Sequence, residues 1–346
     1  KIDLSLERIG DVLGALGLSD PQYRVVTVGG TNGKGSCVAI LESIYSEAGY
    51  STGAYTSPHL WRFNERLRID GREATDSEIL SVFREIEAAR GGISLSYFEY
   101  TTVAAISWFA RNGVDVAILE VGLGGRLDAV NAVDPDASLI VSIDLDHQSW
   151  LGSTREDIAK EKAGIMRPGC PVVVAEADPP ATLPAAAEHL GATLALFGRD
   201  FDYEEGGDRW RYLSPTWSSG LLPKPGFGGD VQLGNAAACL AVVRALGGAL
   251  PVDEEAIERG IANSTVHGRA ERHEIDGVEW IFDVAHNPAA ARVLASELLS
   301  VAGERTTYAG FGAMADKDVA GLLHPFIEKV GSWTTTRVGG ERAADE

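Results

Sequence analysis

The sequence predicts an α/β fold in which an open sheet with helices on its faces is followed by a second, smaller α/β domain. Short runs rich in β-branched residues alternate with helical patterns through most of the chain, which is typical of an open α/β sheet. With 346 residues, the chain can bury a large core and is expected to form two domains. A glycine-rich turn joins the first strand pattern to a long helix pattern, as in many phosphate-binding α/β proteins.

Strands are expected where short apolar runs are bounded by turn residues. In chain order these are Tyr23–Val28, Asp115–Val121, Ser138–Ile143, Pro171–Glu176, Trp280–Val284 and Thr306–Phe311. Helices are expected where apolar residues recur at helical spacing. These are Lys34–Ala48, Asp76–Ala89, Phe98–Asn112, Thr154–Ala163, Gly234–Leu246, Glu254–Ala262, Pro288–Ala302 and Asp316–Val330. The stretch from Phe201 to Asp230, rich in Gly, Trp and Pro, is expected to be an irregular excursion or a small hairpin.

The domain boundary is expected near His267, so that residues 1–266 form the first domain and residues 267–346 the second. The second domain then has only about three strands, which is short for a doubly wound domain. We therefore expect the chain to be cut at its C-terminus. The chain also opens on Lys1 rather than methionine, so we expect an N-terminal piece to be absent as well.

The charge balance argues against several classes of partner. The chain has 50 acidic and 30 basic residues, for a net charge of −20, and long-range repulsion opposes binding to nucleic acid or anionic membranes. No signal peptide is visible, and no apolar run reaches membrane-spanning length. Cys37, Cys170 and Cys239 form no metal-binding or redox pattern and are typical of buried residues in a reducing cytosol. We expect a cytoplasmic protein with small-molecule partners.

The stretch "VVTVGGTNGKGSCVAILESI" resembles a phosphate-binding P-loop but departs from its spacing. The standard pattern is Gly, any four residues, then Gly-Lys-Ser/Thr. Here Val28 replaces the first glycine, and Gly35 separates Lys34 from Ser36. A strand, a glycine turn and a helix N-terminus nevertheless form the context in which backbone N–H groups bind phosphate. Lys34 would reach the β- and γ-phosphates; the alternative is an ordinary glycine-rich turn with an exposed lysine.

Two later clusters place polar side chains at strand ends. In "VAILEVGLGGRLDAVN", Glu120 ends a strand and a glycine turn follows, so Glu120 is a natural Mg²⁺ ligand or, alternatively, a solvated acid. In "VSIDLDHQSWLGSTREDIAKEKAGI", His147 follows another strand, and a helix carrying Lys162 comes next. A lone histidine is usually structural. Because ligands bind at the carboxyl edge of open α/β sheets, the loop, Glu120 and His147 together favour a metal–nucleotide site.

Several longer motifs occur in a fixed order along nearly the whole chain. They are "GGTNGKGS", "GAYTSPHLWRFNERLRIDG", "ISLSYFEY", "LEVGLGGRLDAVN", "DHQSWLGSTREDIAKEKAGIMRPG", "FDVAHNPAAA" and "MADKD". Together they resemble the bifunctional dihydrofolate synthase/folylpolyglutamate synthase family of Mur-ligase-like ATP-dependent amide ligases. The resemblance implies a P-loop ATPase domain of Mur ligase type followed by a smaller, truncated Rossmann-like domain. It also implies that the extra glycine in "TNGKGS" is the family's own variant of the loop.

The resemblance implies roles for individual residues. ATP would be bound by Thr31, Asn32, Gly33, Lys34, Gly35, Ser36, Asn235, Arg269 and Asp283. Two Mg²⁺ ions would be held by Ser57, Glu120 and His147, with help from a carbamylated Lys162. The catalytic set would be Lys34, Lys162 and His147. Pteroate would contact Ser96, Tyr97, Phe98, Glu99 and Leu127, although "SLSYFEY" alone is more typical of a helix entry with core aromatics.

The activity that the resemblance implies is ATP-driven ligation of L-glutamate to dihydropteroate and to folates through an acyl phosphate, by a monomer. A Mur-type cell-wall ligase is the main alternative, but it normally carries a UDP-sugar-binding domain before the loop, and only residues 1–23 precede the first strand here. A monofunctional folylpolyglutamate synthase is another. A P-loop switch or kinase would lack Glu120, His147 and Lys162, and a binding protein with a dead site would be expected to have lost Lys34 or Glu120.

Overall fold

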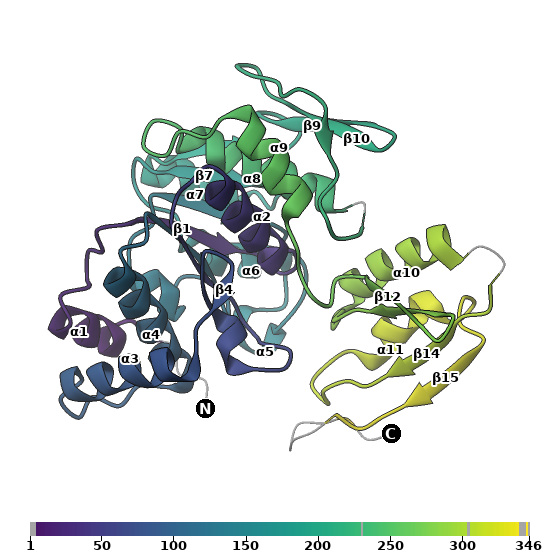
Figure 1. Ribbon diagram of the computed structural model, residues 1–346, viewed down its shortest axis with the longest axis horizontal. Coiled ribbons are helices and arrows are strands. Elements are labelled where there is room, and N and C mark those ends of the chain that lie inside the picture. Colours follow the sequence, from purple (N-terminus) through teal and green to yellow (C-terminus); the bar gives the residue numbers. More distant parts are fainter. Residues whose placement is uncertain (1–4, 230, 303–304, 339–343, 345–346) are drawn as a thin grey trace. The chain divides into compact units, whose positions relative to one another are not determined.

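The computed structural model describes residues 5–229, 231–302, 305–338 and 344. The chain divides into two units (Figure 1). Unit 1 comprises residues 1–226 and 233–265, and unit 2 comprises residues 227–232 and 266–346. Asp230, at the end of the expected excursion, lies outside the described residues, as do the terminal residues Lys1 and Glu346.

An eight-stranded sheet in the order β4-β3-β2-β5-β1-β6-β7-β8 forms the centre of unit 1. The strands are β1 (Arg24–Gly29), β2 (Thr52–Tyr55), β3 (Leu67–Ile69), β4 (Arg72–Glu73), β5 (Val116–Glu120), β6 (Ala137–Ile140), β7 (Pro171–Val174) and β8 (Thr193–Leu196). Strands β2, β5, β1, β6, β7 and β8 run parallel, whereas β3 and β4 are antiparallel to their neighbours. The four strands expected in this region are present within a few residues of their predicted bounds; β2, β3, β4 and β8 were not expected.

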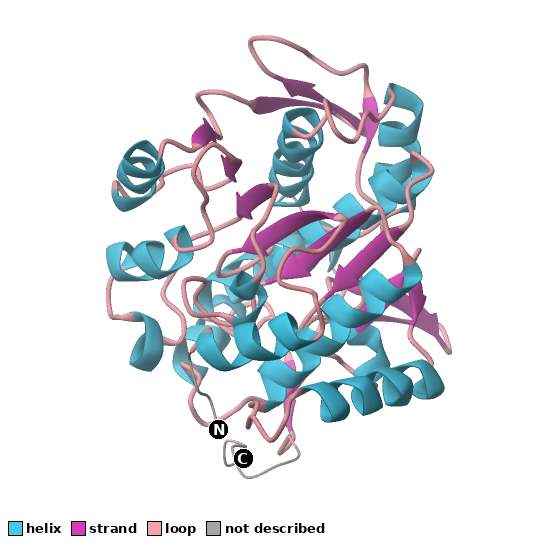
Figure 2. Ribbon diagram, turned by 90° about the vertical axis from the view of Figure 1, so that its left-hand side faces the viewer, coloured by secondary structure: helices cyan, strands magenta, loops and turns pink. Residues whose placement is uncertain are grey.

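Helices lie on both sides of the parallel strands (Figure 2). They are α1 (Glu7–Ala15), α2 (Lys34–Glu47), α3 (Asp76–Ala89), α4 (Tyr97–Asn112), α5 (Gln148–Leu151), α6 (Arg155–Ala163), α7 (Thr182–Leu190), α8 (Val231–Ala245) and α9 (Glu254–Asn263), with 3-10 turns η1 (Phe63–Arg66) and η2 (Ala129–Ala132). Because both faces are covered, β5 is buried along its whole length. Among the described residues, no helix is both long enough and apolar enough to cross a bilayer.

Helices α2 and α9 approach each other closely at Gly260, and this contact makes a stability prediction. A methyl group at Gly260 would lie 2.5 Å from Ile44 Cα and 2.8 Å from Ile44 N. We expect Gly260→Ala to lower the free energy of unfolding by about 1–3 kcal/mol in a urea titration, because overpacking outweighs the better helix propensity of alanine.

The matched control for Gly260→Ala is Gly10→Ala in α1. A methyl group at Gly10 would meet no described heavy atom within 4 Å. Gly10→Ala is therefore expected to stabilise the chain by up to about 1 kcal/mol through helix propensity alone. An unchanged stability in Gly260→Ala would show that α9 can move away from α2 at no cost.

Of the two expected forms of the excursion, the small hairpin is present, and a third strand extends it into a small antiparallel sheet. Its strands are β9 (Asp202–Gly206), β10 (Arg209–Leu213) and β11 (Leu222–Pro223), in the order β11-β10-β9. Trp210 is fully buried in this sheet, and its indole Nε1 donates a hydrogen bond of 2.8 Å to the carbonyl oxygen of Pro223. The buried aromatic side chain explains why a segment rich in Gly and Pro is ordered.

Unit 2 contains a hairpin and a parallel strand pair. The hairpin joins β12 (Glu271–Ile275) to β13 (Val278–Phe282), and β14 (Tyr308–Phe311) pairs in parallel with β15 (Ser332–Thr335). The helices are α10 (Pro288–Ala302) and α11 (Val319–Leu323), followed by the 3-10 turn η3 (His324–Phe326). The expected helix Asp316–Val330 is wrong over most of its length. Asp318 caps α11 by accepting a hydrogen bond from Gly321 N. After α11 the chain continues as η3, with Pro325 in its first turn, and then as a turn over residues 327–329.

Candidate active site

The glycine-rich loop between β1 and α2 is built from backbone contacts that leave the N-terminus of α2 accessible to a ligand. Gly33 is the N-cap of α2, with a φ of 87°. A side chain there would be strained, and its Cβ would lie 2.8 Å from Val141 Cγ1 and 3.1 Å from the amide oxygen of Asn235. The N–H of Thr31 donates to the carbonyl oxygen of Ser142 at 2.8 Å. The loop is thus clamped onto the segment after β6, with Asn235 of α8 beside it.

Two side chains at the start of α2 suit a phosphate and a cation. Lys34 Nζ donates hydrogen bonds to the carbonyl oxygens of Gly30 and Thr31, at 3.0 and 3.1 Å. The fully buried Ser36 hydroxyl has no hydrogen-bond partner among the described residues. A buried oxygen of this kind fits Mg²⁺, which takes oxygen ligands. Lys34 is partly buried, not fully exposed as the ordinary-turn alternative supposed.

Glu120 lies at the end of β5 and is buried rather than solvated, with only 5% of its surface exposed. Its Oε2 accepts a hydrogen bond of 3.0 Å from the backbone N–H of Ser57. It also lies near the first turn of α2, because a Cβ added at Gly35 would be 3.9 Å from Oε2. The structure therefore brings Ser57, Glu120 and the glycine-rich loop together at one edge of the sheet, and the reading of Glu120 as a solvated acid is wrong.

His147 follows β6 in a left-handed conformation, with a φ of 50°, at the start of α5. Its backbone N–H donates to Asp146 Oδ1 at 2.9 Å, and its ring Nε2 lies 3.9 Å from Asp146 Oδ2. No three His, Cys, Asp or Glu side chains in the described part of the chain are grouped to hold a metal. Any ion bound near Glu120 and His147 would therefore need further ligands of another kind, such as Ser57, Ser36 or a modified Lys162.

Lys162 is buried in α6, with 3% of its surface exposed. Burial is the largest cause that lowers the pKa of its amine, and the positive charge of Lys34 also lowers it; against opposing effects of Asp146 and Asp128, the result is a pKa of about 7. Lys162 is therefore not a surface lysine. Glu161 pairs with Arg126 at 2.9 Å.

Glycines explain how α6 comes close enough to bury Lys162. A Cβ at Gly125 would lie 2.8 Å from the carbonyl oxygen of Glu161 and 3.1 Å from Lys162 Cα. A Cβ at Gly164 would likewise overlap Arg126. Only glycine allows the turn after β5 to pack directly on α6. The "GLGG" run thus brings α6 and its lysine against the end of β5.

Asp128 is a buried carboxylate for which the sequence motifs predicted no role. Its oxygens accept hydrogen bonds from Leu123 N at 2.8 Å and Val130 N at 3.1 Å, so it shapes the turn after β5 that also carries Leu127. Burial raises the pKa of Asp128 to about 6. The sequence signal was its place as N-cap of the short turn η2, where aspartate is favoured.

The entry to α4 combines capping with an exposed ring. Ser96 Oγ accepts a hydrogen bond from Glu99 N, and the Glu99 carboxylate accepts one of 2.6 Å from Ser96 N and two of 3.0 Å from Arg8. Phe98 packs on Gly122, where a Cβ would overlap its ring. Tyr97 is 59% exposed. Ser96, Phe98 and Glu99 thus match the helix-entry reading, whereas Tyr97 is open to a ligand.

Sequence reasoning missed the residues that surround Tyr97. The guanidinium of Arg66 lies 5.5 Å from the centre of the Tyr97 ring, and the Phe63 ring lies 6.3 Å from it. Arg66 Nε donates a hydrogen bond of 2.9 Å to His59 Nδ1. The motif "SPHLWRFNER" contains these three residues, but nothing in their spacing indicated that they meet the start of α4.

Comparison with known proteins identifies the fold and the family. The Mur ligase middle domain matches residues 28–243, and the Mur ligase glutamate ligase domain matches residues 268–346. The dihydrofolate synthase/folylpolyglutamate synthase of Escherichia coli (strain K12) is 43% identical over 343 residues, covering 99% of this chain and 80% of that protein. The chain belongs to the dihydrofolate synthase/folylpolyglutamate synthase family of Mur ligases.

Solved structures of related Mur ligases are similar throughout. E. coli FolC in complex with DHPP and ADP has a TM-score of 0.94 and 43% identity, covering 99% of this chain and 81% of that one. A bifunctional folylpolyglutamate synthase/dihydrofolate synthase with Mn, AMPPNP and L-glutamate bound has a TM-score of 0.92 and 42% identity, covering 99% and 82%. The first of these relatives holds ADP, and the second holds AMPPNP with a metal ion.

The two remaining nucleotide candidates of this Mur ligase, Arg269 and Asp283, lie in unit 2. Arg269 precedes β12, and Asp283 follows β13. The Asp283 carboxylate accepts hydrogen bonds from Ala270 N at 2.9 Å and Ala285 N at 2.7 Å. Asp283 therefore holds the residue after Arg269 in place at the open end of the hairpin.

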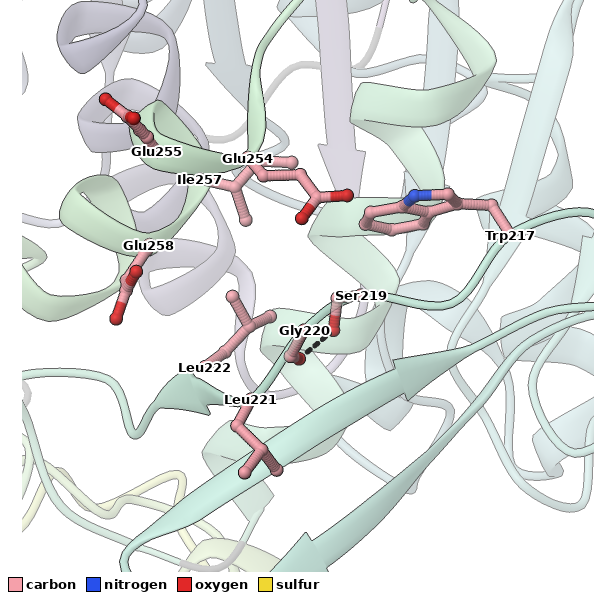
Figure 3. Close-up of a pocket in the computed structure, with 9 residues that line it drawn as sticks. All are labelled: Trp217, Ser219, Gly220, Leu221, Leu222, Glu254, Glu255, Ile257 and Glu258. Carbon is pink, nitrogen blue, oxygen red and sulfur yellow. Dashed lines mark hydrogen bonds between the residues drawn. The ribbon is translucent and has the colours of Figure 1, made fainter.

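A separate cavity lies between the small sheet of unit 1 and α9 (Figure 3). Its volume is about 200 Å³, and its lining includes Trp217, Leu222, Glu254 and Ile257. None of the residues assigned above to nucleotide, metal or pteroate lines it.

Proposed function

We propose that the chain is an ATP-dependent ligase that joins L-glutamate to dihydropteroate, forming dihydrofolate, and to folates, forming polyglutamates. The observation that best supports this proposal is that the loop at α2, Glu120 and the buried Lys162 lie at one edge of the sheet. Relatives that share this fold over 99% of the chain are named for both activities. We further propose that it acts as a monomer in the cytosol. Its three cysteines form no disulfide, which agrees with a reducing compartment.

The chemistry follows from the weakness of a carboxylate as an electrophile. Transfer of the γ-phosphoryl group of ATP to the acceptor carboxylate gives an acyl phosphate, whose phosphate is a good leaving group. The glutamate amine then attacks the acyl carbon, and phosphate departs with the C–O electron pair. Lys34 and the N–H groups at the start of α2 stabilise negative charge on the transferring phosphoryl group.

A metal site that includes Glu120 would assist this transfer. Ser36, Ser57, Glu120 and His147 would hold Mg²⁺, which supplies charge neutralisation on the nucleotide phosphates when bound. We also propose that Lys162 is carbamylated. Its neutral amine nitrogen attacks the carbon of CO₂ and loses a proton to solvent, so that a cation becomes an oxygen-bearing anion. The lowered pKa of the buried amine favours the neutral, reactive form.

Phosphate release, measured with each acceptor and its amino acid, tests the proposal. Dihydropteroate with L-glutamate and tetrahydrofolate with L-glutamate should both give ATP-dependent phosphate release, and a UDP-sugar peptide should not. Release with tetrahydrofolate alone would identify a monofunctional folylpolyglutamate synthase. Release with the UDP-sugar peptide alone would identify a cell-wall ligase and overturn the proposal.

Glu120→Gln tests the metal assignment. Glutamine keeps an oxygen that can accept the Ser57 N–H but removes the charge that attracts Mg²⁺. We expect the Mg²⁺ concentration for half-maximal activity to rise about tenfold or more. Glu73→Gln, on the exposed edge strand β4, is the control and should titrate like the parent. A Glu120→Gln titration curve that overlays the parent curve would remove Glu120 from the metal site.

A further inference from the structure

One carboxylate fixes the tip of the loop between β2 and β3, residues 56–66. Glu65 Oε1 accepts hydrogen bonds from the backbone N–H groups of Trp61 and Arg62 at 2.7 and 2.6 Å, and Oε2 accepts one from Leu60 at 2.6 Å. Trp61 is 88% exposed and Leu60 is 41% exposed, so apolar burial does not hold this segment. Short hydrogen bonds to a charged acceptor are strong ones. The conformation of the tip therefore depends on Glu65.

The base of the same loop is held by other groups. Thr56 N donates to the carbonyl oxygen of Arg66 at 3.0 Å, and Arg68 Nη1 donates to the carbonyl oxygen of Glu65 at 3.1 Å. The Ser57 N–H is bound by Glu120. Losing the Glu65 carboxylate would release the tip without detaching the base from the sheet or from the metal-binding edge.

The loop carries side chains that surround the exposed Tyr97. Arg66 lies over the Tyr97 ring and also binds His59, as described above. The Phe63 ring lies 6.3 Å from the rings of both His59 and Tyr97. His59 directly precedes the segment whose N–H groups Glu65 binds. The position of these rings beside Tyr97 is therefore coupled to the shape of the tip.

We propose that Glu65 is a positioning residue for the acceptor substrate, dihydropteroate or folate. It preorganises the loop so that His59, Phe63 and Arg66 are in place beside Tyr97 before the acceptor arrives. This inference rests on the proposed function and on the pteroate contact that the family resemblance implies for Tyr97. A loop ordered in advance spares the acceptor the entropy of ordering it, so Glu65 acts on acceptor affinity and not on phosphoryl transfer.

Glu65→Gln is the sharpest variant, because glutamine has the same length but turns an NH₂ group toward backbone N–H donors. Without a charge-assisted hydrogen bond, the KM for dihydropteroate should rise about tenfold or more. The kcat and the dissociation constant of ADP should stay within about twofold of the parent values. Glu73→Gln, a nearby exposed carboxylate, is the matched control and should leave all three unchanged.

Trypsin cleavage after Arg62 in the native protein gives a readout that needs no turnover. The supporting result is faster cleavage at this site in Glu65→Gln than in Glu73→Gln, together with the raised KM. An unchanged KM, or an equal loss of kcat and ADP affinity, overturns the role in acceptor binding. Equal cleavage rates overturn the role of Glu65 in holding the loop. A parent protein that ligates no glutamate overturns the proposed function, and with it the substrate named here, but does not affect the cleavage result.

Discussion

Replacing Lys34 with alanine is expected to lower the rate of ATP-dependent glutamate ligation roughly 10²-fold or more. Lys34 is positioned at the N-terminus of α2, with its amine 3.0 Å from the carbonyl oxygen of Gly30. Its charge would stabilise the phosphoryl group in transfer, where negative charge develops, so kcat should fall more than KM rises. Initial rates of phosphate release at saturating dihydropteroate and L-glutamate measure the effect.

The Lys34→Ala chain is expected to remain folded, because the loop has other anchors. Thr31 N and Asn32 N donate to the carbonyl and hydroxyl oxygens of Ser142, and Ser142 lies beyond β6. Lys224→Ala is the control, since Lys224 is an exposed lysine that pairs with Glu205 at 2.6 Å. Lys224→Ala should keep the parent activity. Near-normal ligation by Lys34→Ala would mean that the loop is not the ATP site.

Lys162→Ala is expected to lose activity by roughly 10²-fold or more, because loss of a metal ligand costs several kcal/mol of transition-state stabilisation. Short carboxylic acids should partly restore the rate, since they can occupy the cavity left by the side chain and supply the oxygen atoms of the carbamate. Lys160→Ala is the matched control: Lys160 lies two residues earlier on α6 and is exposed. A fully active Lys162→Ala enzyme would contradict both the carbamate and the metal role.

The pH dependence of stability tests Lys162 separately from catalysis. The pKa of the buried amine is lowered to about 7 from its usual 10.5. Between these values the unfolded chain binds a proton that the folded chain does not, so the contribution of Lys162 to stability rises with pH across this window and is lost as pH falls toward 7. Without CO₂, this rise should be present in urea titrations of the parent and missing from Lys162→Ala.

The fold of unit 1 could be predicted because its strands are buried on both faces. Val116–Glu120 is apolar until its last residue, and such a run is visible without any knowledge of the partner strands. The strand Glu271–Ile275 in unit 2 is polar and mostly exposed, so only its pairing with β13 identifies it. The segment Asp316–Val330 shows helical spacing, but packing around Leu322 and Phe326 selects a short helix and a 3-10 turn instead.

The sequence predicts those site residues that follow the ends of neighbouring strands. It does not predict the residues that are brought together by packing between distant segments. Glu120 and the glycine-rich loop follow neighbouring parallel strands, so their proximity follows from sheet topology. The burial of Lys162 cannot be read from "AKEKAGI" alone, because it also requires the close approach of Gly125, which belongs to a distant segment of the chain. The meeting of Arg66 with Tyr97 likewise joins two segments with no shared pattern.

The order of strands in the central sheet also constrains how the nascent chain acquires its nucleotide loop. Strand β1 lies between β5 and β6, so Thr27 is paired with both Leu119 and Ser138. The clamp on the loop comes from Ser142, later still in the chain. During synthesis from the N-terminus, the loop at residues 30–33 is made early, but the strands beside β1 follow much later: β5 is complete only at Glu120 and β6 only at Ile140. A ribosome-bound fragment that ends before β6 therefore contains the complete loop sequence but lacks the contacts that shape it.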